Sequence, residues 1–285
     1  SALERKREGR VMTWVPPYAV DACRERLDQS FDGVGMKDGL THLGLQFWQP
    51  TREGDLKLVE GFQVIDETTI LKFKKWGDSH GIQTMLCVYN GTSAGWDWEL
   101  AKGAFDTHRK RFVDALVSET LRLKLDGVDI DLEGKGKLEG DRKAYVRFIK
   151  ELSARLHAIG KELTIDTFAY QWHAPNQAWW AELLPHLDGL HVMGYAETGA
   201  GAADWRSYEF IKAAAGEHAS KLLLGVPGKA ATWQNKPASE HLAWIQNDGS
   251  LGLAIWDARL SSPAWRNKGM WQMIAKIKGI AEVRK

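Results

Sequence analysis

The stretch LDGVDIDLEGKG, residues 125–136, places a carboxylate at every second position of an apolar run. Asp129, Asp131 and Glu133 alternate with branched aliphatic residues at positions 128, 130 and 132. Alternate residues of a β-strand point to the same face. The stretch therefore predicts a strand with one acidic face and one apolar face.

Seven further stretches of the chain have the length and the apolar, β-forming composition of buried strands. Together with the acidic stretch they lie at residues 11–16, 41–47, 82–89, 126–133, 163–170, 190–195, 222–228 and 251–256. Segments with helical spacing lie between them. This alternation over 285 residues favours a (β/α)8 TIM barrel, which typically needs ~250 residues. An open, doubly wound sheet is the alternative.

The domain organisation follows from the same alternation. We find no linker and no low-complexity tract, so we expect residues 1–285 to form one (β/α)8 catalytic domain. Residues 1–10 include the charged run LERKREGR and are expected to be a flexible N-terminal segment.

The barrel determines where the acidic face of this strand points. In a barrel the apolar face of a strand packs on the outer helices, so the acidic face points to the interior. Glu133 comes last in the fourth strand, at the carboxyl end where barrel enzymes build their active sites. The alternative is an edge strand with a solvated acidic face, but both neighbouring strands are apolar and flanked by helical segments.

Two neighbouring acids on one strand face suit acid catalysis. Asp131 and Glu133 would have backbones ~6.6 Å apart, so one carboxyl stays ionised while the pKa of the other rises. A carboxyl group with a raised pKa can protonate a leaving oxygen, as glycosidic cleavage requires. The rival is a magnesium or calcium site, but the stretch lacks the EF-hand order. We therefore predict no metal and no cofactor.

Composition excludes several other classes of function. The chain carries 38 basic and 37 acidic residues, so no basic field is available to attract nucleic acid or an anionic membrane. No apolar run is long enough to span a bilayer. The two cysteines, Cys23 and Cys87, form neither a disulfide framework nor a zinc set. The 14 tryptophans instead suggest a flat, partly apolar ligand.

The acidic motif resembles the signature of a known enzyme family. DGVDIDLE is similar to the Asp-x-x-Asp-x-Asp-x-Glu signature of glycoside hydrolase family 18, the chitinases and endo-β-N-acetylglucosaminidases, and its first acid is Asp126. VMGY in the sixth strand resembles the Met-x-Tyr of the family, and AIW in the eighth strand supplies its tryptophan. The position after Tyr195 is Ala196, where chitinases of the family commonly carry Asp.

The resemblance implies a retaining reaction assisted by the substrate. Glu133 would protonate the glycosidic oxygen, and the 2-acetamido oxygen of the sugar would attack the anomeric carbon. Asp131 would orient the acetamido group with support from Asp129, and Tyr195 would bind its carbonyl. Trp256 would form the floor beneath the cleaved sugar.

Several tryptophans follow predicted strands and would surround the mouth of the barrel, where they could stack on sugar rings. These are Trp48, Trp96, Trp98, Trp172 and Trp233. Four others lie in helical segments and are better explained by core packing: Trp179, Trp180, Trp244 and Trp271. The absence of a long insertion after the seventh strand predicts a shallower cleft than that of deep-cleft chitinases.

The sequence analysis predicts hydrolysis of β-1,4 bonds next to N-acetylglucosamine in chitin or its oligomers. An endo-β-N-acetylglucosaminidase acting on N-glycans or peptidoglycan is the alternative. Two remote alternatives are a non-catalytic carbohydrate-binding barrel, which the presence of Glu133 disfavours, and a serine hydrolase, because GTSAG at 91–95 fits Gly-x-Ser-x-Gly. The expected partner is a glycan containing N-acetylglucosamine; we expect a monomer, and such a substrate favours a secreted or cell-envelope location.

Overall fold

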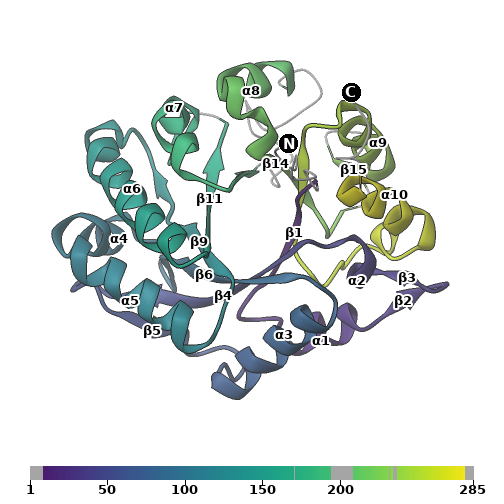
Figure 1. The fold of residues 1–285 in the computed structure, drawn as a ribbon, viewed down its shortest axis with the longest axis horizontal. Coiled ribbons are helices and arrows are strands. Elements are labelled where there is room, and N and C mark those ends of the chain that lie inside the picture. Colours follow the sequence, from purple (N-terminus) through teal and green to yellow (C-terminus); the bar gives the residue numbers. More distant parts are fainter. Residues whose placement is uncertain (1–8, 170, 194–207, 231, 234–235, 280–285) are drawn as a thin grey trace, which may run out of the picture.

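Eight parallel strands form a closed barrel in the computed structural model, which describes residues 9–169, 171–193, 208–230, 232–233 and 236–279 (Figure 1). Strand β1 pairs with both β17 and β4, which closes the sheet. This closure rules out the open sheet. The barrel strands are β1 (Val11–Val15), β4 (His42–Pro50), β6 (Gln83–Tyr89), β9 (Gly127–Asp131), β11 (Glu162–Phe168), β13 (Gly189–Met193), β14 (Leu222–Pro227) and β17 (Gly252–Trp256).

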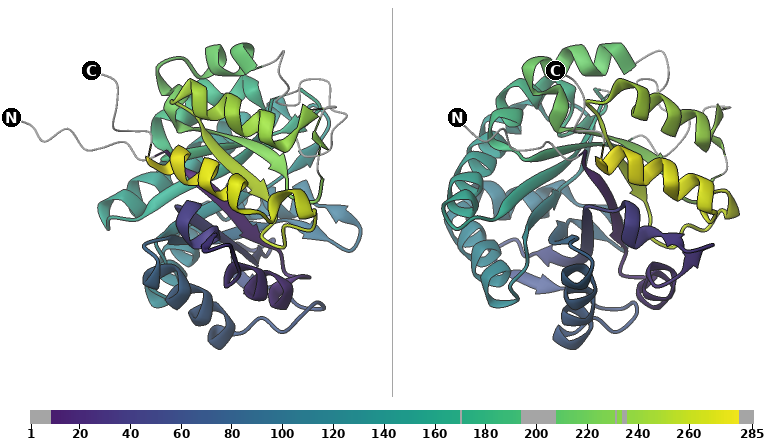
Figure 2. Two further views of the ribbon diagram at one scale, coloured as in Figure 1. Left: turned by 90° about the vertical axis from the view of Figure 1, so that its right-hand side faces the viewer. Right: turned by 45° about the vertical axis from the view of Figure 1, so that its right-hand side comes forward.

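Helices surround the barrel on its outside, as two further views show (Figure 2). They are α1 (Val20–Leu27), α2 (Met36–Gly39), α3 (Glu67–Ser79), α4 (Trp98–Lys102), α5 (Arg109–Arg122), α6 (Arg142–Ala158), α7 (Trp180–Leu183), α8 (Tyr208–Ala215), α9 (Ala238–Asp248) and α10 (Lys268–Gly279). A π-helical turn spans Gly103–Thr107, and 3₁₀ turns span Glu139–Asp141, Gln177–Trp179, Leu184–His186, Gly216–Lys221 and Pro263–Trp265. Within the described part of the chain, no helix is both long and apolar enough to cross a membrane.

Further short strands lie in the segments that connect the barrel strands and the helices. They are β2 (Ser30–Phe31), β3 (Val34–Gly35), β5 (Leu56–Leu58), β7 (Gly91–Thr92), β8 (Gly95–Trp96), β10 (Gly134–Lys135), β12 (His173–Ala174), β15 (Thr232–Trp233) and β16 (Lys236–Pro237). The GTSAG segment thus folds into the β7–β8 hairpin. A nucleophile elbow leads from a strand directly into a helix, so the serine-hydrolase interpretation is wrong.

The two faces of β9 behave as its alternation predicts. Val128, Ile130 and Leu132 are fully buried among the helices, in the larger hydrophobic core. A smaller apolar cluster fills the barrel interior and is formed by Met12, Trp14, Met85, Cys87, Leu223 and Ala254. Asp129 and Asp131 point into this interior, so the acidic face is enclosed by the barrel.

An ion-pair network closes the amino-terminal end of the barrel. One Glu162 oxygen, Oε2, lies 2.7 Å from the Arg10 guanidinium and 2.9 Å from His42 Nε2. Burial alone would raise the pKa of Glu162, but the hydrogen bonds and charges of His42 and Arg10 outweigh it and hold that pKa well below its usual range. Arg10, at the end of the segment expected to be flexible, is therefore anchored to β11.

The first acid of the motif is at this same end. Asp126 precedes β9, and its Oδ2 accepts hydrogen bonds from Thr84 N at 2.7 Å and Lys74 Nζ at 3.1 Å. It thus joins β6 and α3 to the start of β9. Its role is to fix the strand that carries the other acids.

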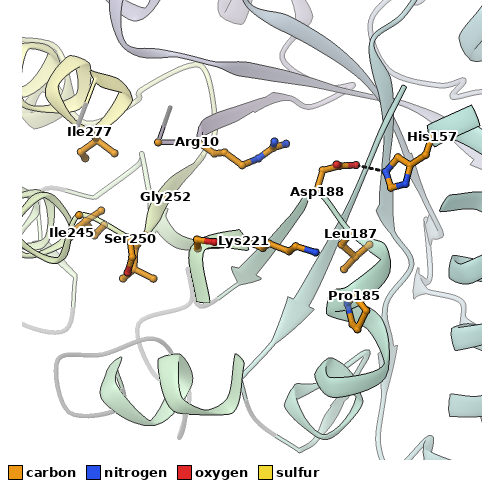
Figure 3. Close-up of a pocket in the computed structure, with 14 residues that line it drawn as sticks. Arg10, His157, Pro185, Leu187, Asp188, Lys221, Ile245, Ser250, Gly252 and Ile277 are labelled. Carbon is orange, nitrogen blue, oxygen red and sulfur yellow. Dashed lines mark hydrogen bonds and ion pairs between the residues drawn. The ribbon is translucent and has the colours of Figure 1, made fainter. Parts of the chain in front are cut away.

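A pocket of about 480 Å³ opens beside this end of the barrel (Figure 3). It is lined by Arg10, Asp188 and Gly252, which lie at or just before the starts of β1, β13 and β17. An ion pair of 2.7 Å between His157 and Asp188 forms part of its wall. The pocket is therefore at the opposite end of the strands from Glu133.

Tight packing inside the barrel requires Gly44. A Cβ at this position would lie 2.6 Å from Trp14 Cδ1 and 2.7 Å from Met12 Cε. The Trp14 indole cannot easily move, because its Nε1 donates a hydrogen bond of 2.8 Å to Asp129. Glycine at 44 thus makes room for the tryptophan that contacts the acid cluster.

We predict that Gly44→Ala lowers the free energy of unfolding by ~1–3 kcal/mol, the usual cost of overpacking a core. Urea denaturation would measure it. Gly140→Ala is the matched control, because a Cβ there meets no atom within 4 Å, and it should cause no loss of stability. Equal stability of the two variants would contradict the packing argument.

Candidate active site

Three carboxyl groups rise in steps from the barrel interior to its mouth. Asp129 is fully buried and Asp131 is 4% exposed. Glu133 lies two residues past the end of β9 and keeps some exposure to solvent. The structure thus brings the predicted acids together in the predicted order.

Asp129 is surrounded by donors. Its Oδ2 accepts the Trp14 Nε1–H at 2.8 Å, and its Oδ1 accepts the Thr164 hydroxyl at 2.6 Å. His191 Nδ1 lies 3.4 Å from the same Oδ1. Burial raises the pKa of Asp129, but the charge and hydrogen bond of His191, together with the other two hydrogen bonds, lower it below the ordinary value. Asp129 is therefore the ionised member of the cluster.

A second buried acid adjoins it. Asp166 Oδ1 lies 2.7 Å from His191 Nδ1, and both side chains are enclosed in the barrel. Burial, followed by the charges of Asp129 and Asp131, raises the pKa of Asp166 well above its ordinary value. Trp14 packs edge-on against the imidazole, with ring centroids 5.0 Å apart. Asp166 consequently holds a proton more firmly than an ordinary aspartate, beside the more acidic Asp129.

Asp131 has one oxygen satisfied and one free. Its Oδ2 accepts a hydrogen bond of 3.0 Å from Gln46 Nε2. Its Oδ1 is buried and has no hydrogen-bond partner among the described residues. Burial raises the pKa of Asp131 to about 6, with Asp129 acting in the same direction and the hydrogen bonds of Glu133 and Gln46 opposing. The free oxygen is a ready acceptor for a ligand N–H.

Glu133 is held by its backbone. Its N–H donates to Asn90 Oδ1 at 2.8 Å, and its C=O accepts from Asn90 Nδ2 at 2.9 Å. Burial, the charge of Asp131 and the hydrogen bond between the two carboxyls raise the pKa of Glu133 well above its ordinary value. The two acids interact strongly, and of the two it is Glu133, at the mouth of the barrel, that holds a proton more firmly.

The buried acids also approach the spacing of metal ligands. Donor atoms of Cys87, Asp131 and Asp166 lie within 4.8 Å of one another, as do those of Asp129, Asp166 and His191. A metal needs deprotonated ligands. Burial, followed by the neighbouring carboxylates, raises the pKa of the Cys87 thiol well above its ordinary value, and Asp166 is raised likewise. The cluster is better suited to sharing protons than to binding a cation.

The loop tryptophans divide into exposed and buried sets. Trp96 is 37% and Trp172 is 64% exposed, after β6 and β11 respectively. Trp256 ends β17 and is half-buried, with its ring 5.8 Å from that of Trp14. These three have surface available for a ligand at the carboxyl ends of the strands.

Two of the predicted sugar-stacking residues are in the core. Trp48 is 1% exposed, because β4 continues to Pro50 and carries it within the strand, where its Nε1 donates to Glu119 at 3.3 Å. Trp98 is 7% exposed, because it begins α4 and its Nε1 donates to Asp141 at 2.9 Å. Neither indole has a face available for a sugar, so these two assignments are corrected to packing.

Other predicted residues have different outcomes. Trp179, Trp180 and Trp271 are fully buried, as expected for packing residues. The backbone of Trp233 lies in β15, but its side chain is outside the described part of the structure. Tyr195 and Ala196 also lie outside the described residues, so the role of Tyr195 stays a prediction.

Sequence reasoning missed the residues that hold the acids. These are Trp14, Gln46, Asn90, Thr164, Asp166 and His191. Most of them lie on strands that were predicted correctly, at positions that share the interior face. A polar residue or tryptophan inside an apolar strand run was the available signal. Their contacts with the acids depend on the register between strands, which one sequence does not reveal.

Comparisons with known proteins agree with this geometry. A family model described as glycosyl hydrolases family 18 matches residues 18–276. A chitinase from Chromobacterium violaceum ATCC 12472 is similar in structure, with a TM-score of 0.72 and 16% identity over 97% of this chain and 100% of that chain. Among curated proteins, no sequence matches.

Two further solved structures represent different activities. The Group IV chitinase of Ostrinia furnacalis, in complex with allosamidin, has a TM-score of 0.71 and 14% identity over 96% of this chain and 98% of that chain. The spore cortex-lytic enzyme SleL of Bacillus megaterium QM B1551 has a TM-score of 0.69 and 14% identity, covering 96% of this chain and 75% of that chain. At such identities these likenesses show the fold alone.

The raised pKa of Asp131 implies that the free energy of unfolding depends on pH. A carboxyl group with a folded pKa of about 6 and an unfolded pKa of ~3.9 destabilises the fold as pH rises between these values, by up to ~3 kcal/mol at neutral pH. Asp131→Asn removes this ionisation. We expect it to raise the free energy of unfolding at pH 7.5 by about 2–3 kcal/mol, with little change at pH 4.

Urea denaturation at both pH values would measure the difference. Glu53→Gln, a change at an exposed turn between β4 and β5, is the control and should alter neither value. At each pH, the quantity to compare is the change in the free energy of unfolding that Asp131→Asn causes. A change that is less favourable at pH 7.5 than at pH 4 would contradict the raised pKa of Asp131.

Proposed function

The chain belongs to glycosyl hydrolases family 18, and from this premise we propose that it hydrolyses β-1,4 bonds next to N-acetylglucosamine with retention of configuration. Membership confirms the family and the glycosidase activity inferred from the four acids. The observation that carries the finer proposal is the Asp131–Glu133 pair, in which a carboxyl with a raised pKa lies beside a carboxyl whose buried Oδ1 has no hydrogen-bond partner among the described residues.

The first step uses these two groups together. Glu133 donates its proton to the glycosidic oxygen as the bond to the anomeric carbon breaks. The oxygen of the substrate's own 2-acetamido group forms a new bond to that carbon, which gives a cyclic oxazolinium ion and releases the leaving sugar. Asp131 accepts the acetamido N–H on its free Oδ1 and balances the positive charge. This assisted route needs no protein nucleophile.

The second step reverses the proton transfer. The Glu133 carboxylate takes a proton from water while the water oxygen attacks the anomeric carbon and the ring opens. The acetamido group is restored and the acid is again protonated. Two inversions at one carbon give net retention. Asp129 supports Asp131 by staying ionised below it, and Trp256 forms the floor beneath the sugar.

Chitin and its oligomers are the first choice of substrate. The Met-x-Tyr segment favours the chitinase branch, and two of the similar structures are chitinases. An endo-β-N-acetylglucosaminidase acting on peptidoglycan or N-glycans is the second candidate. The similarity to a spore cortex-lytic enzyme favours keeping peptidoglycan under consideration.

We predict that Glu133→Gln lowers kcat by ~10²–10⁴-fold, as expected for loss of a general acid. Asn90 holds the backbone of residue 133, so the variant should remain folded. Mass spectrometry of products from chitin hexasaccharide and from a high-mannose glycopeptide would measure the loss and identify the substrate. Glu99→Gln, at an exposed acid on α4, is the matched control, and a Glu133→Gln rate within a few-fold of it would remove Glu133 from this role.

The assisted route predicts a strict requirement for the acetamido group. An oligomer of glucose with the same length lacks the attacking oxygen and should not be cleaved, even at enzyme concentrations that exhaust the N-acetylglucosamine oligomer. Product analysis at matched concentrations tests this. Comparable rates on the two oligomers would indicate a protein nucleophile instead.

A further inference from the structure

A small platform of cationic and aromatic side chains adjoins the catalytic acid. We call it the ledge and define it as Lys135, Lys137, Trp172 and His173. It is built by antiparallel pairing of β10 with β12, in which Lys135 is opposite His173. The Gly136 N–H donates to Trp172 O at 2.7 Å. The ledge is thus a hydrogen-bonded element and not two independent loops.

The ledge lies close to the catalytic acid, Glu133, because the two are adjacent along the chain. Lys135 follows Glu133 by two residues, so their Cα atoms are at most ~7 Å apart. The two halves of the ledge leave the carboxyl ends of β9 and β11, which are neighbours in the barrel. Because Asn90 fixes the backbone of Glu133, the ledge starts from a fixed point beside the acid.

Lys135 and Lys137 differ from the cations around them. Lys102 and Arg142 each lie 2.7 Å from a carboxylate, that of Asp141 and of Glu139 respectively. Lys135 and Lys137 are exposed and form no ion pair with any residue in the described part of the chain. Among the described residues, their positive charges therefore have no carboxylate partner and face the solvent beside the acid.

The aromatic part of the ledge presents a face beside these charges. Trp172 is 64% exposed, and Lys137 Nζ lies over its ring, 5.6 Å from the ring centroid. His173 is opposite Lys135 in the β10–β12 pair, and burial, followed by the charge of Lys135, lowers the pKa of His173. His173 in turn packs on Phe168 at the end of β11, with centroids 4.8 Å apart. An exposed indole in contact with an ammonium group can receive the apolar face of a sugar and a carboxylate at once.

We propose that the ledge is a subsite for an acidic sugar, that is, a residue with a carboxylate next to the N-acetylglucosamine whose bond is cleaved. This inference rests on the proposed glycosidase function and narrows its substrate class to anionic glycans. A neutral ring would use only the face of Trp172. A carboxylate would also pair with Lys135 and Lys137, for which the described part of the chain supplies no ion-pair partner. A lactyl ether and a uronic acid are two sources of the same carboxylate.

The central comparison of the test is between a glycan that carries carboxylates and its amidated form, which lacks their charge. The probes are a chitin oligomer, an oligomer alternating N-acetylglucosamine with N-acetylmuramic acid, the same oligomer with its carboxylates amidated, and a hyaluronan oligomer. The proteins are the parent chain, Lys135→Gln/Lys137→Gln, and the control Lys72→Gln/Lys75→Gln, which removes equal charge from exposed positions of α3. The readout is kcat/KM for each glycan at low and high salt.

We expect the parent chain to prefer the carboxylate over the amide. Two exposed charge pairs should make this preference about three- to tenfold, and it should fall toward one in Lys135→Gln/Lys137→Gln and at high salt. The control should keep the preference. Preference for the muramic acid oligomer would identify a lactyl carboxylate, and preference for hyaluronan a uronic acid.

An unchanged ratio between carboxylate and amide in Lys135→Gln/Lys137→Gln would overturn the ledge proposal while leaving the glycosidase intact. Cleavage of no glycan by the parent chain would instead overturn the proposed function. In that event calorimetric binding of the carboxylate and amide oligomers to Glu133→Gln, with and without the lysine substitutions, still decides whether the ledge recognises the anion.

Discussion

The acids of the active site lie in and above a barrel interior that contains many apolar side chains, and the cost of charge in that interior governs the site. The most acidic of them, Asp129, is stabilised there by Trp14, Thr164 and His191. Because one anion is already present, each further ionisation above it becomes less favourable. The surrounding side chains have to support this order of ionisation among the acids.

Proton affinity consequently rises from the interior toward the mouth. Along β9 and the residues just past it, the pKa of Asp129 is lowered, that of Asp131 is raised to about 6, and that of Glu133 is raised well above its ordinary value. The group that holds its proton most firmly among these three is thus the one nearest the mouth, where substrate arrives. Their acid strength follows from position along one strand and not from the chemical difference between aspartate and glutamate.

The sequence was sufficient for the repeating features and insufficient for the contacts between strands. Alternation with period two predicted the interior face of β9, and the regular succession of strand and helix predicted the barrel. Trp48 was misplaced because β4 runs past the end of its apolar pattern, so an indole expected on a loop packs against α5. His191 and Asp166 could not be paired in advance, since their contact depends on the register of β11 against β13. Gln46 and Asn90 carried no pattern of their own.

Asn90 has a consequence for how this surface can change over evolution. One fully buried amide bonds both backbone groups of Glu133 and the Asp97 carbonyl, and the side chain of Asp97 in turn caps α4. Two loops, the one between β6 and α4 and the one after β9, therefore share one anchoring side chain. Sequence drift in the surrounding loops can alter what the mouth accommodates without moving the acid, whereas a change at position 90 would loosen both loops together. The loop positions around the acid should thus tolerate substitution better than Asn90 does.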